Sequence, residues 1–488
     1  MDILNKMKHF LLFLTILFFA SCSEKNKKLS FALQQAGNNR IELEKVLNHY
    51  KNDSLKYKAT VFLIENMPNY KYANSKEVDS IKALMSQIFE QWDLTEQERQ
   101  KGLNWQKHID YEIKNDIKEI KAELLIENID YAFKVWEEKP WNKHLSFEDF
   151  CELILPYRIA EEPLTYWRKK YYEKYNPILD SLYKGTDVVE ACNILSDYIK
   201  KEKFFFINDF VIPRQGADFH FSNRIGICRD ACDIAIYIMR SVGIPVTSDI
   251  YAISPEYHSG HQWNVVRDTT NRYLPFLFEE YRANRDNMLI DKLKKGKVYR
   301  MTYQENKSEQ KLNYPSSPLN NPFLKDVTNE YFGNNKVELP FENNLDSDDI
   351  FLGIFTSYDW FPVGKGKIEN RKLIFENIEP FVIYQPLTYK NNELKPITYP
   401  FMYQKDGVRI FSPKNEKQEV VLKRKYPLRK TNSGRYKNWL LLTEIKGSNN
   451  SQFSNSDLLH KMENLPSENV IEININSQKS YQYFQYQD

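Results

Sequence analysis

A cysteine and a histidine in the middle of the chain are the residues best suited to chemistry. Cys228 stands in the segment Gly-Ile-Cys-Arg-Asp-Ala-Cys at 226–232, and His261 opens the segment His-Gln-Trp-Asn-Val at 261–265. A thiolate is a strong nucleophile, and an imidazole within reach can take the proton of the thiol. The chemistry that these two residue types indicate is attack on an amide carbonyl.

The residues after Cys228 predict the helix that positions it. An apolar stripe at helical spacing follows, and Gly243 and Pro245 are residues that end helices. Cys228 therefore falls at the expected N-terminus of a buried helix. Because the free backbone N–H groups there favour an anion, we expect the thiol pKa to lie below its usual ~8.5 and the same amides to stabilise an oxyanion. The stripe consists of Ile234, Ala235, Ile238, Met239 and Val242.

The histidine belongs to an expected β-hairpin. Residues 246–253 are strand-like, and from His261 the chain alternates so that His261, Trp263 and Val265 share one face. A turn at 268–271 leads into a second strand at 272–278. The order is thus a cysteine at a helix start, followed by a histidine on a strand that can bring its ring to the thiol.

These segments resemble the transglutaminase-like superfamily, which has a papain-type α+β core. The resemblance is carried by G-I-C-R-D, M-R-S-V-G-I-P-V, H-Q-W-N-V and Y-L-P-F, over roughly 75 to 90 residues. It implies that Cys228 is the nucleophile and His261 the general base, and it implies no cofactor. Segments 44–50, 62–68 and 154–158 also resemble a group of bacterial transglutaminase-like lipoproteins.

One position departs from the family pattern. An Asp usually closes the strand that Y-L-P-F begins and orients the imidazole, but Leu277 stands there. We expect Glu279, two residues on and on the same face of that strand, to take its place. Without an orienting acid the tautomer of the histidine is less well controlled, which weakens the enzymatic interpretation.

Two other interpretations remain open. Cys228, Cys232, His258 and His261 together approach a zinc-ligand set, although their H-x2-H spacing is tight. The chain could also be a non-catalytic binding protein for a glycan or peptide on a degenerate scaffold, as Leu277 suggests. Otherwise Cys232 and Trp263 are predicted to pack in the core, and Asp230 and Asp233 to be helix N-terminal charges.

The beginning of the chain resembles a bacterial lipoprotein signal. Lys6 and Lys8 precede an apolar run at 10–20, which is too short to span a bilayer, and Phe-Ala-Ser-Cys at 19–22 resembles a lipobox. This predicts cleavage after residue 21 and lipidation of Cys22. The expected location is the cell envelope, anchored in the outer membrane and facing the periplasm or the surface.

Length and composition indicate several domains. The expected fold class is an α-helical N-terminal domain, an α+β transglutaminase-like (papain-like) domain, and all-β sandwich domains at the C-terminus. With 68 basic and 66 acidic residues in 488, the charge gives no sign of nucleic-acid binding. The expected parts are a signal peptide (1–21), a tether (22–40), a helical domain (41–200), a transglutaminase-like domain (201–303), a linker (304–324), a β-sandwich (325–425) and a short β module, complete or partial (426–488).

Overall fold

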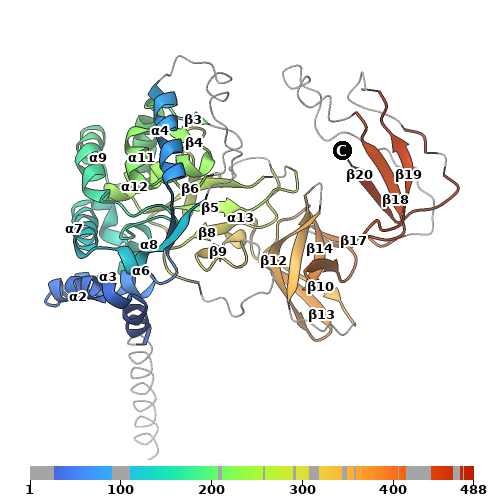
Figure 1. The fold of residues 1–488 in the computed structure, drawn as a ribbon, viewed down its shortest axis with the longest axis horizontal. Coiled ribbons are helices and arrows are strands. Elements are labelled where there is room, and N and C mark those ends of the chain that lie inside the picture. The colour runs from blue at the N-terminus through green and yellow to red at the C-terminus, as the bar shows by residue number, and fades with distance from the viewer. Residues whose placement is uncertain are drawn as a thin grey trace, which may run out of the picture. The chain divides into compact units, whose positions relative to one another are not determined.

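The computed structural model describes residues 27–90, 110–206, 212–256, 259–288, 293–306, 318–342, 349–356, 359–404, 406–413, 441–464, 473–475 and 477–487. These residues form helices and mostly antiparallel sheets, an α+β fold (Figure 1). The chain divides into two compact units, Met1–Arg409 and Ile410–Asp488. The finer division into domains stays a prediction, and the expected signal peptide with Cys22 lies outside the described residues.

The first part of the chain is helical, as expected. Ser146 caps one of these helices, since its Oγ accepts the N–H of Asp149 at 3.1 Å. The sequence pattern also predicts a helix from Pro163 to Tyr175, but the helix begins only at Arg168. The Glu162 carboxylate holds the preceding loop by accepting the N–H groups of Ile159 and Ala160. The elements are η1 (Gly37–Asn39), α2 (Arg40–His49), α3 (Ser54–Glu65), β1 (Lys71–Asn74), α4 (Lys76–Glu90), β2 (Glu112–Asn115), α6 (Asp116–Glu119), α7 (Ala122–Glu138), η2 (Pro140–His144), α8 (Phe147–Leu153), α9 (Arg168–Leu182) and α10 (Val188–Lys201).

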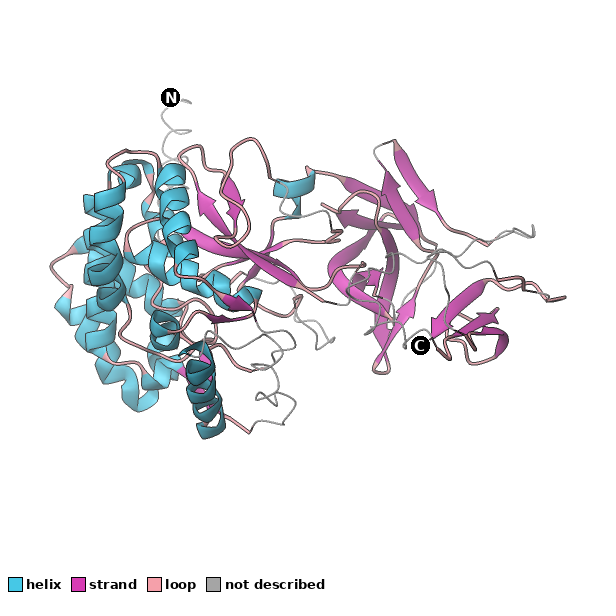
Figure 2. Ribbon diagram, turned by 90° about the horizontal axis from the view of Figure 1, so that it is seen from above, coloured by secondary structure: helices cyan, strands magenta, loops and turns pink. Residues whose placement is uncertain are grey.

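A five-stranded antiparallel sheet and one buried helix form the centre of the first unit. The sheet order is β7-β6-β5-β8-β9, and α12 (Cys228–Ser241) packs against β6 and α9. Figure 2 shows the helices of this unit gathered beside its strands. The elements of this region are β3 (Phe205–Phe206), α11 (Ala217–Ser222), β4 (Ile225–Gly226), β5 (Val246–Tyr251), β6 (His261–Arg267), β7 (Tyr273–Phe276), β8 (Tyr299–Met301), β9 (Leu324–Asp326) and α13 (Thr328–Phe332).

An antiparallel eight-stranded sheet follows in the same unit, with the order β10-β13-β12-β11-β14-β16-β17 and β15 paired to β14. The alternation of short β-like runs and turns predicts strands at 337–339, 350–355, 381–384, 408–411 and 420–422. The first four overlap β10, β11, β14 and β17, whereas 420–422 lies outside the described residues. The packing of two sheets into a sandwich stays a prediction. The strands are β10 (Lys336–Pro340), β11 (Ile350–Phe355), β12 (Trp360–Glu369), β13 (Lys372–Glu376), β14 (Ile383–Lys390), β15 (Glu393–Pro396), β16 (Phe401–Gln404) and β17 (Gly407–Ile410).

The second unit contains a three-stranded antiparallel sheet, β19-β18-β20. Its strands are β18 (Glu444–Ser448), β19 (Ser456–Lys461) and β20 (Tyr483–Gln487). The sequence pattern predicts a last β segment at 440–442 and 470–475. This prediction is wrong for Leu441 and Leu442, which form a turn in which Leu442 has a φ of +74°, and for residues 473–475, which are not strand. None of the helices described in either unit is long and apolar enough to cross a bilayer.

Candidate active site

Cys228 is the first residue of α12, as the sequence predicts, and Asp230 fixes the turn that leads into it. The Asp230 Oδ2 accepts the N–H of Ile227 at 2.9 Å, which caps the helix. A Cβ placed on Gly226 would come within 2.5 Å of the Asp230 Cβ, so this position requires glycine. The turn at 226–228 is therefore held by its contacts with Asp230.

The thiol itself differs from the expectation of a lowered pKa. Burial raises the pKa of Cys228, while the backbone N–H groups of Gln262 and Arg229 act in the opposite direction and do not outweigh it. The expected lowering of this pKa is wrong because the partly buried sulfur loses hydration where α12 packs against β6, and this desolvation is the larger effect. The same observation places the sulfur beside the amide of Gln262, the residue next to His261.

His261 opens β6, opposite Tyr251 of β5. Its ring centroid lies 6.0 Å from that of Trp263 and 6.1 Å from that of Tyr251. Alternate residues of β6 face the helix, because the Asn264 Nδ2 donates to the carbonyl of Cys232 at 3.1 Å. The structure thus brings the backbone of Gln262 to Cys228 and places the ring of His261 near those of Trp263 and Tyr251. The pairing of the Cys228 and His261 side chains stays a prediction.

The expected orienting acid is placed differently from the prediction. The strand β7 ends at Phe276, and Leu277 and Tyr281 close a tight turn with two backbone hydrogen bonds of 3.0 and 2.9 Å. Glu279 lies in that turn, not on the strand, so the expectation of a shared strand face is wrong. Burial raises the pKa of Glu279, whose charged neighbours are Lys200 and Glu280. Leu277 is buried in the core beneath α12.

The zinc-ligand set can be compared with the structure only in part, because His258 lies outside the described residues. Cys232 is fully buried, as the prediction that it packs in the core requires. Burial raises the pKa of its thiol well above the ordinary value. Trp263 is also core, with its Nε1 donating to the Tyr331 Oη at 2.9 Å.

A polar layer between α12 and the sheet was missed by the sequence analysis. Arg214 donates to Asp233, and the Gln262 Nε2 donates to the Ser248 Oγ at 2.9 Å. Burial raises the pKa of Asp233 to about 7 and lowers that of His220. Aspartates inside a helix with an apolar stripe, which the structure buries almost throughout, were the available signal, since a buried carboxylate requires partners. Those partners, His220 and Arg214, come from other elements and have no local signature.

Two of the hollows on the described part of the first unit are large, and neither of these two is lined by Cys228 or His261. One, of about 760 Å³, lies beside α10 and Arg285. The other, of about 1080 Å³, is rich in lysine and asparagine side chains. Those side chains are Lys71, Lys297, Lys325, Lys365, Lys367, Asn69, Asn306, Asn320, Asn321 and Asn377.

Comparison with known proteins yields one solved structure, a candidate cysteine protease from Cytophaga hutchinsonii. The two chains are 18% identical over the aligned region, with a TM-score of 0.19, and the match covers 24% of this chain and 37% of the other. No protein-family model and no curated protein matches this chain.

Proposed function

We propose that this chain is a cysteine amide hydrolase or acyltransferase of the transglutaminase-like type, with Cys228 as nucleophile and His261 as general base. The observation that supports it best is the placement of the Cys228 sulfur at the start of α12, where the amides of Gln262 and Arg229 favour its anionic form. Because burial keeps the thiol protonated, a neighbouring base is needed to activate it.

The proposed reaction has two steps. The Cys228 sulfur bonds to the amide carbonyl carbon, its proton passes through His261 to the leaving nitrogen, and the C–N bond breaks to release an amine. Water then attacks the thioester, and the thiol regains its proton while the acid leaves. An amine in place of water would give a new amide and thus cross-linking.

For this chemistry the imidazole of His261 must come within hydrogen-bond reach of the Cys228 sulfur, directly or through one water. His261 is only partly buried at the first position of β6, next to the residue whose amide favours the thiolate.

The substrate class follows from the proposed location. We propose that lipidated Cys22 anchors the chain to a membrane of the bacterial envelope and that the substrate is a peptide or glycopeptide amide there. Radiolabelled palmitate should enter the wild-type chain in cells and should not enter Cys22→Ser. Incorporation into both chains, or into neither, would contradict the anchor.

A thiol-directed label tests the catalytic pair. At neutral pH, iodoacetamide should modify Cys228 in preference to the buried Cys151, Cys192 and Cys232, as peptide mapping would show. The rate should fall at least about tenfold in His261→Ala and remain unchanged in His144→Ala, which alters an exposed histidine. Equal rates in wild type and His261→Ala would refute His261 as the base.

A binding function without catalysis is the second candidate, and two observations favour it. Leu277 is core where the family has an acid, and the 1080 Å³ hollow presents lysine and amide groups suited to glycan hydroxyl or carboxylate groups. This candidate predicts that Cys228 is labelled slowly and at the same rate in wild type and His261→Ala. It also predicts that the chain binds a glycan or peptide and that Lys325→Ala weakens this binding.

A further inference from the structure

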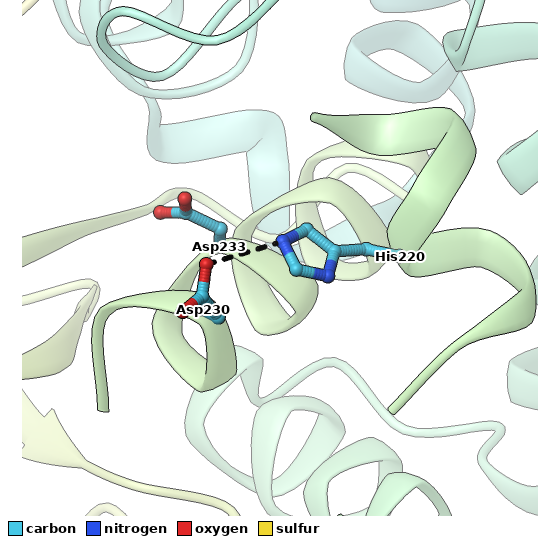
Figure 3. A group of neighbouring side chains, drawn as sticks. All are labelled: His220, Asp230 and Asp233. Carbon is cyan, nitrogen blue, oxygen red and sulfur yellow. Dashed lines mark ion pairs between the residues drawn. The ribbon is translucent and has the colours of Figure 1, made fainter. Parts of the chain in front are cut away.

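Three titratable side chains gather behind the turn that carries Cys228. His220 comes from α11, and Asp230 and Asp233 lie one turn apart on α12 (Figure 3). All three are buried, with exposed fractions of 0%, 0% and 1%. One ligand atom from each lies within 4.8 Å of the others. The cluster therefore joins two helices through side chains that water does not reach.

Each of these side chains keeps a polar atom without a hydrogen-bond partner. Asp230 uses Oδ2 to accept the Ile227 N–H, and Asp233 uses Oδ1 to accept from Arg214. The Asp230 Oδ1, the Asp233 Oδ2 and both His220 nitrogens are unsatisfied. The His220 Nε2 lies 3.6 Å from the Asp230 Oδ1, which is too long for a hydrogen bond. Buried polar atoms normally have hydrogen-bond partners. The unsatisfied atoms of these three side chains therefore indicate that the cluster binds a further group.

The charge around the cluster also favours a cation. Arg214 pairs with both Asp233 and Glu161, and Arg229 approaches Asp230 at 3.8 Å. Glu162 lies close enough to raise the pKa of Asp233. Two guanidinium groups thus face four carboxylates.

The further guanidinium groups beside the cluster have carboxylate partners of their own. Arg224, which donates to the carbonyl of His220, pairs with Glu202. Arg158, which donates to the carbonyl of Glu162, pairs with the equally buried Asp116. Carboxylates therefore outnumber guanidinium groups around the cluster.

We propose that His220, Asp230 and Asp233 bind a divalent transition-metal cation that fastens α11 to the start of α12. One imidazole and two carboxylates suit zinc and its neighbours, whereas calcium and magnesium prefer all-oxygen sites. Zn–N and Zn–O distances near 2.1 Å place tetrahedral ligand atoms about 3.5 Å apart. The 3.6 Å between Nε2 and Oδ1 already meets this spacing, and a side-chain rotation of Asp233 closes the site.

Arg214 and Ile227 then act as supporting partners, because each holds one oxygen of a ligating carboxylate and leaves the other to the metal. The site holds the turn at 226–228 in place, and it does not depend on Cys228 being catalytic. It also differs from the cysteine-containing set considered above, with which it shares no ligand.

Metal content and cobalt spectroscopy of the full chain test the proposal. After dialysis against zinc and then against metal-free buffer, the protein should retain about one equivalent of zinc. Cobalt in its place should give visible d–d bands without the near-ultraviolet charge-transfer band of thiolate ligation. A thiolate band, or no retained zinc and no cobalt spectrum, would overturn the assignment.

Matched variants locate the metal. His220→Gln and Asp233→Asn should each weaken zinc affinity at least about 100-fold in competition with a chelating dye. His144→Gln, which alters an exposed histidine, and Cys228→Ser with Cys232→Ser should keep the affinity of the wild type. Zinc affinity unchanged in His220→Gln would refute the site. If that variant does not fold, the cobalt spectrum of the wild type still decides between the two ligand sets.

Discussion

At the residue scale, position 277 shows how one side chain separates this chain from the family that it resembles. Leu277 is fully buried among α12 and β7 residues, so the position at which the resemblance implies an orienting acid is part of the hydrophobic core. A carboxylate there would lose its hydration without a cation to replace it. Burial in the core therefore favours an apolar side chain at position 277, whatever the histidine would require.

We therefore expect Leu277→Asp to destabilise the protein rather than to activate it. The free energy of unfolding should fall by about 3 kcal/mol or more, because the change combines a lost apolar contact with a buried charge. Denaturant titration measures this, and Leu182→Asp, at a residue 52% exposed, should cost much less. A stable Leu277→Asp chain with faster labelling of Cys228 would show instead that the position still serves the histidine.

At the scale of elements, α10 illustrates how a helix start is held by a group distant in sequence. Asp187 caps α10 by accepting the N–H of Val189 at 2.9 Å. It also accepts two hydrogen bonds of 2.8 Å from Arg285. The bonds from Arg285 are the chief reason that the pKa of Asp187 is lowered.

Removing this carboxylate should weaken the helix start. Asp187→Ala should lower the free energy of unfolding by about 1–2 kcal/mol, since both cap and ion pair are lost. Asp187→Asn keeps the cap and should cost less than about 1 kcal/mol. Equal stability of wild type and Asp187→Ala in urea titration would show that this contact contributes nothing.

The contribution of Asp187 should also depend on pH with a definite sign. Because its pKa is lower when folded, the stabilisation is present above the unfolded-state pKa of about 3.9 and is lost as the pH falls through the folded value. The stability difference between wild type and Asp187→Asn should thus be constant near neutral pH and close in acid. A difference that widens in acid would contradict this.

At the scale of the whole molecule, buried polar contacts join the parts of the first unit. The Nζ of Lys297, 4% exposed, binds Asp326 of β9 and donates to the carbonyls of Glu376 and Asn377 at 2.9 and 2.8 Å. The hydroxyl of Tyr70 donates to the carbonyl of Tyr303 at 2.9 Å, which links the helical part to the segment after β8.

These contacts predict that the five-stranded and the eight-stranded sheet are coupled through Lys297. Lys297→Met should lower the free energy of unfolding by about 2–3 kcal/mol, because it leaves several acceptors without their donor. Hydrogen exchange should become faster in both β9 and β13. Lys372→Met, at a side chain 51% exposed on β13, is the matched control and should change neither. Faster exchange in one sheet alone would mean that the sheets are not coupled.

The sequence determined the features that depend on near neighbours. The start of α12 at Cys228 and the β6–β7 hairpin follow from periodicity and turn residues, which act over a few positions. The sequence could not show the raised pKa of the thiol, the turn that displaces Glu279, or the partners of Asp230 and Asp233. Desolvation and charge pairing depend on which distant segments cover a group, as β6 covers Cys228 and α11 brings His220 to α12, and only the tertiary structure decides that.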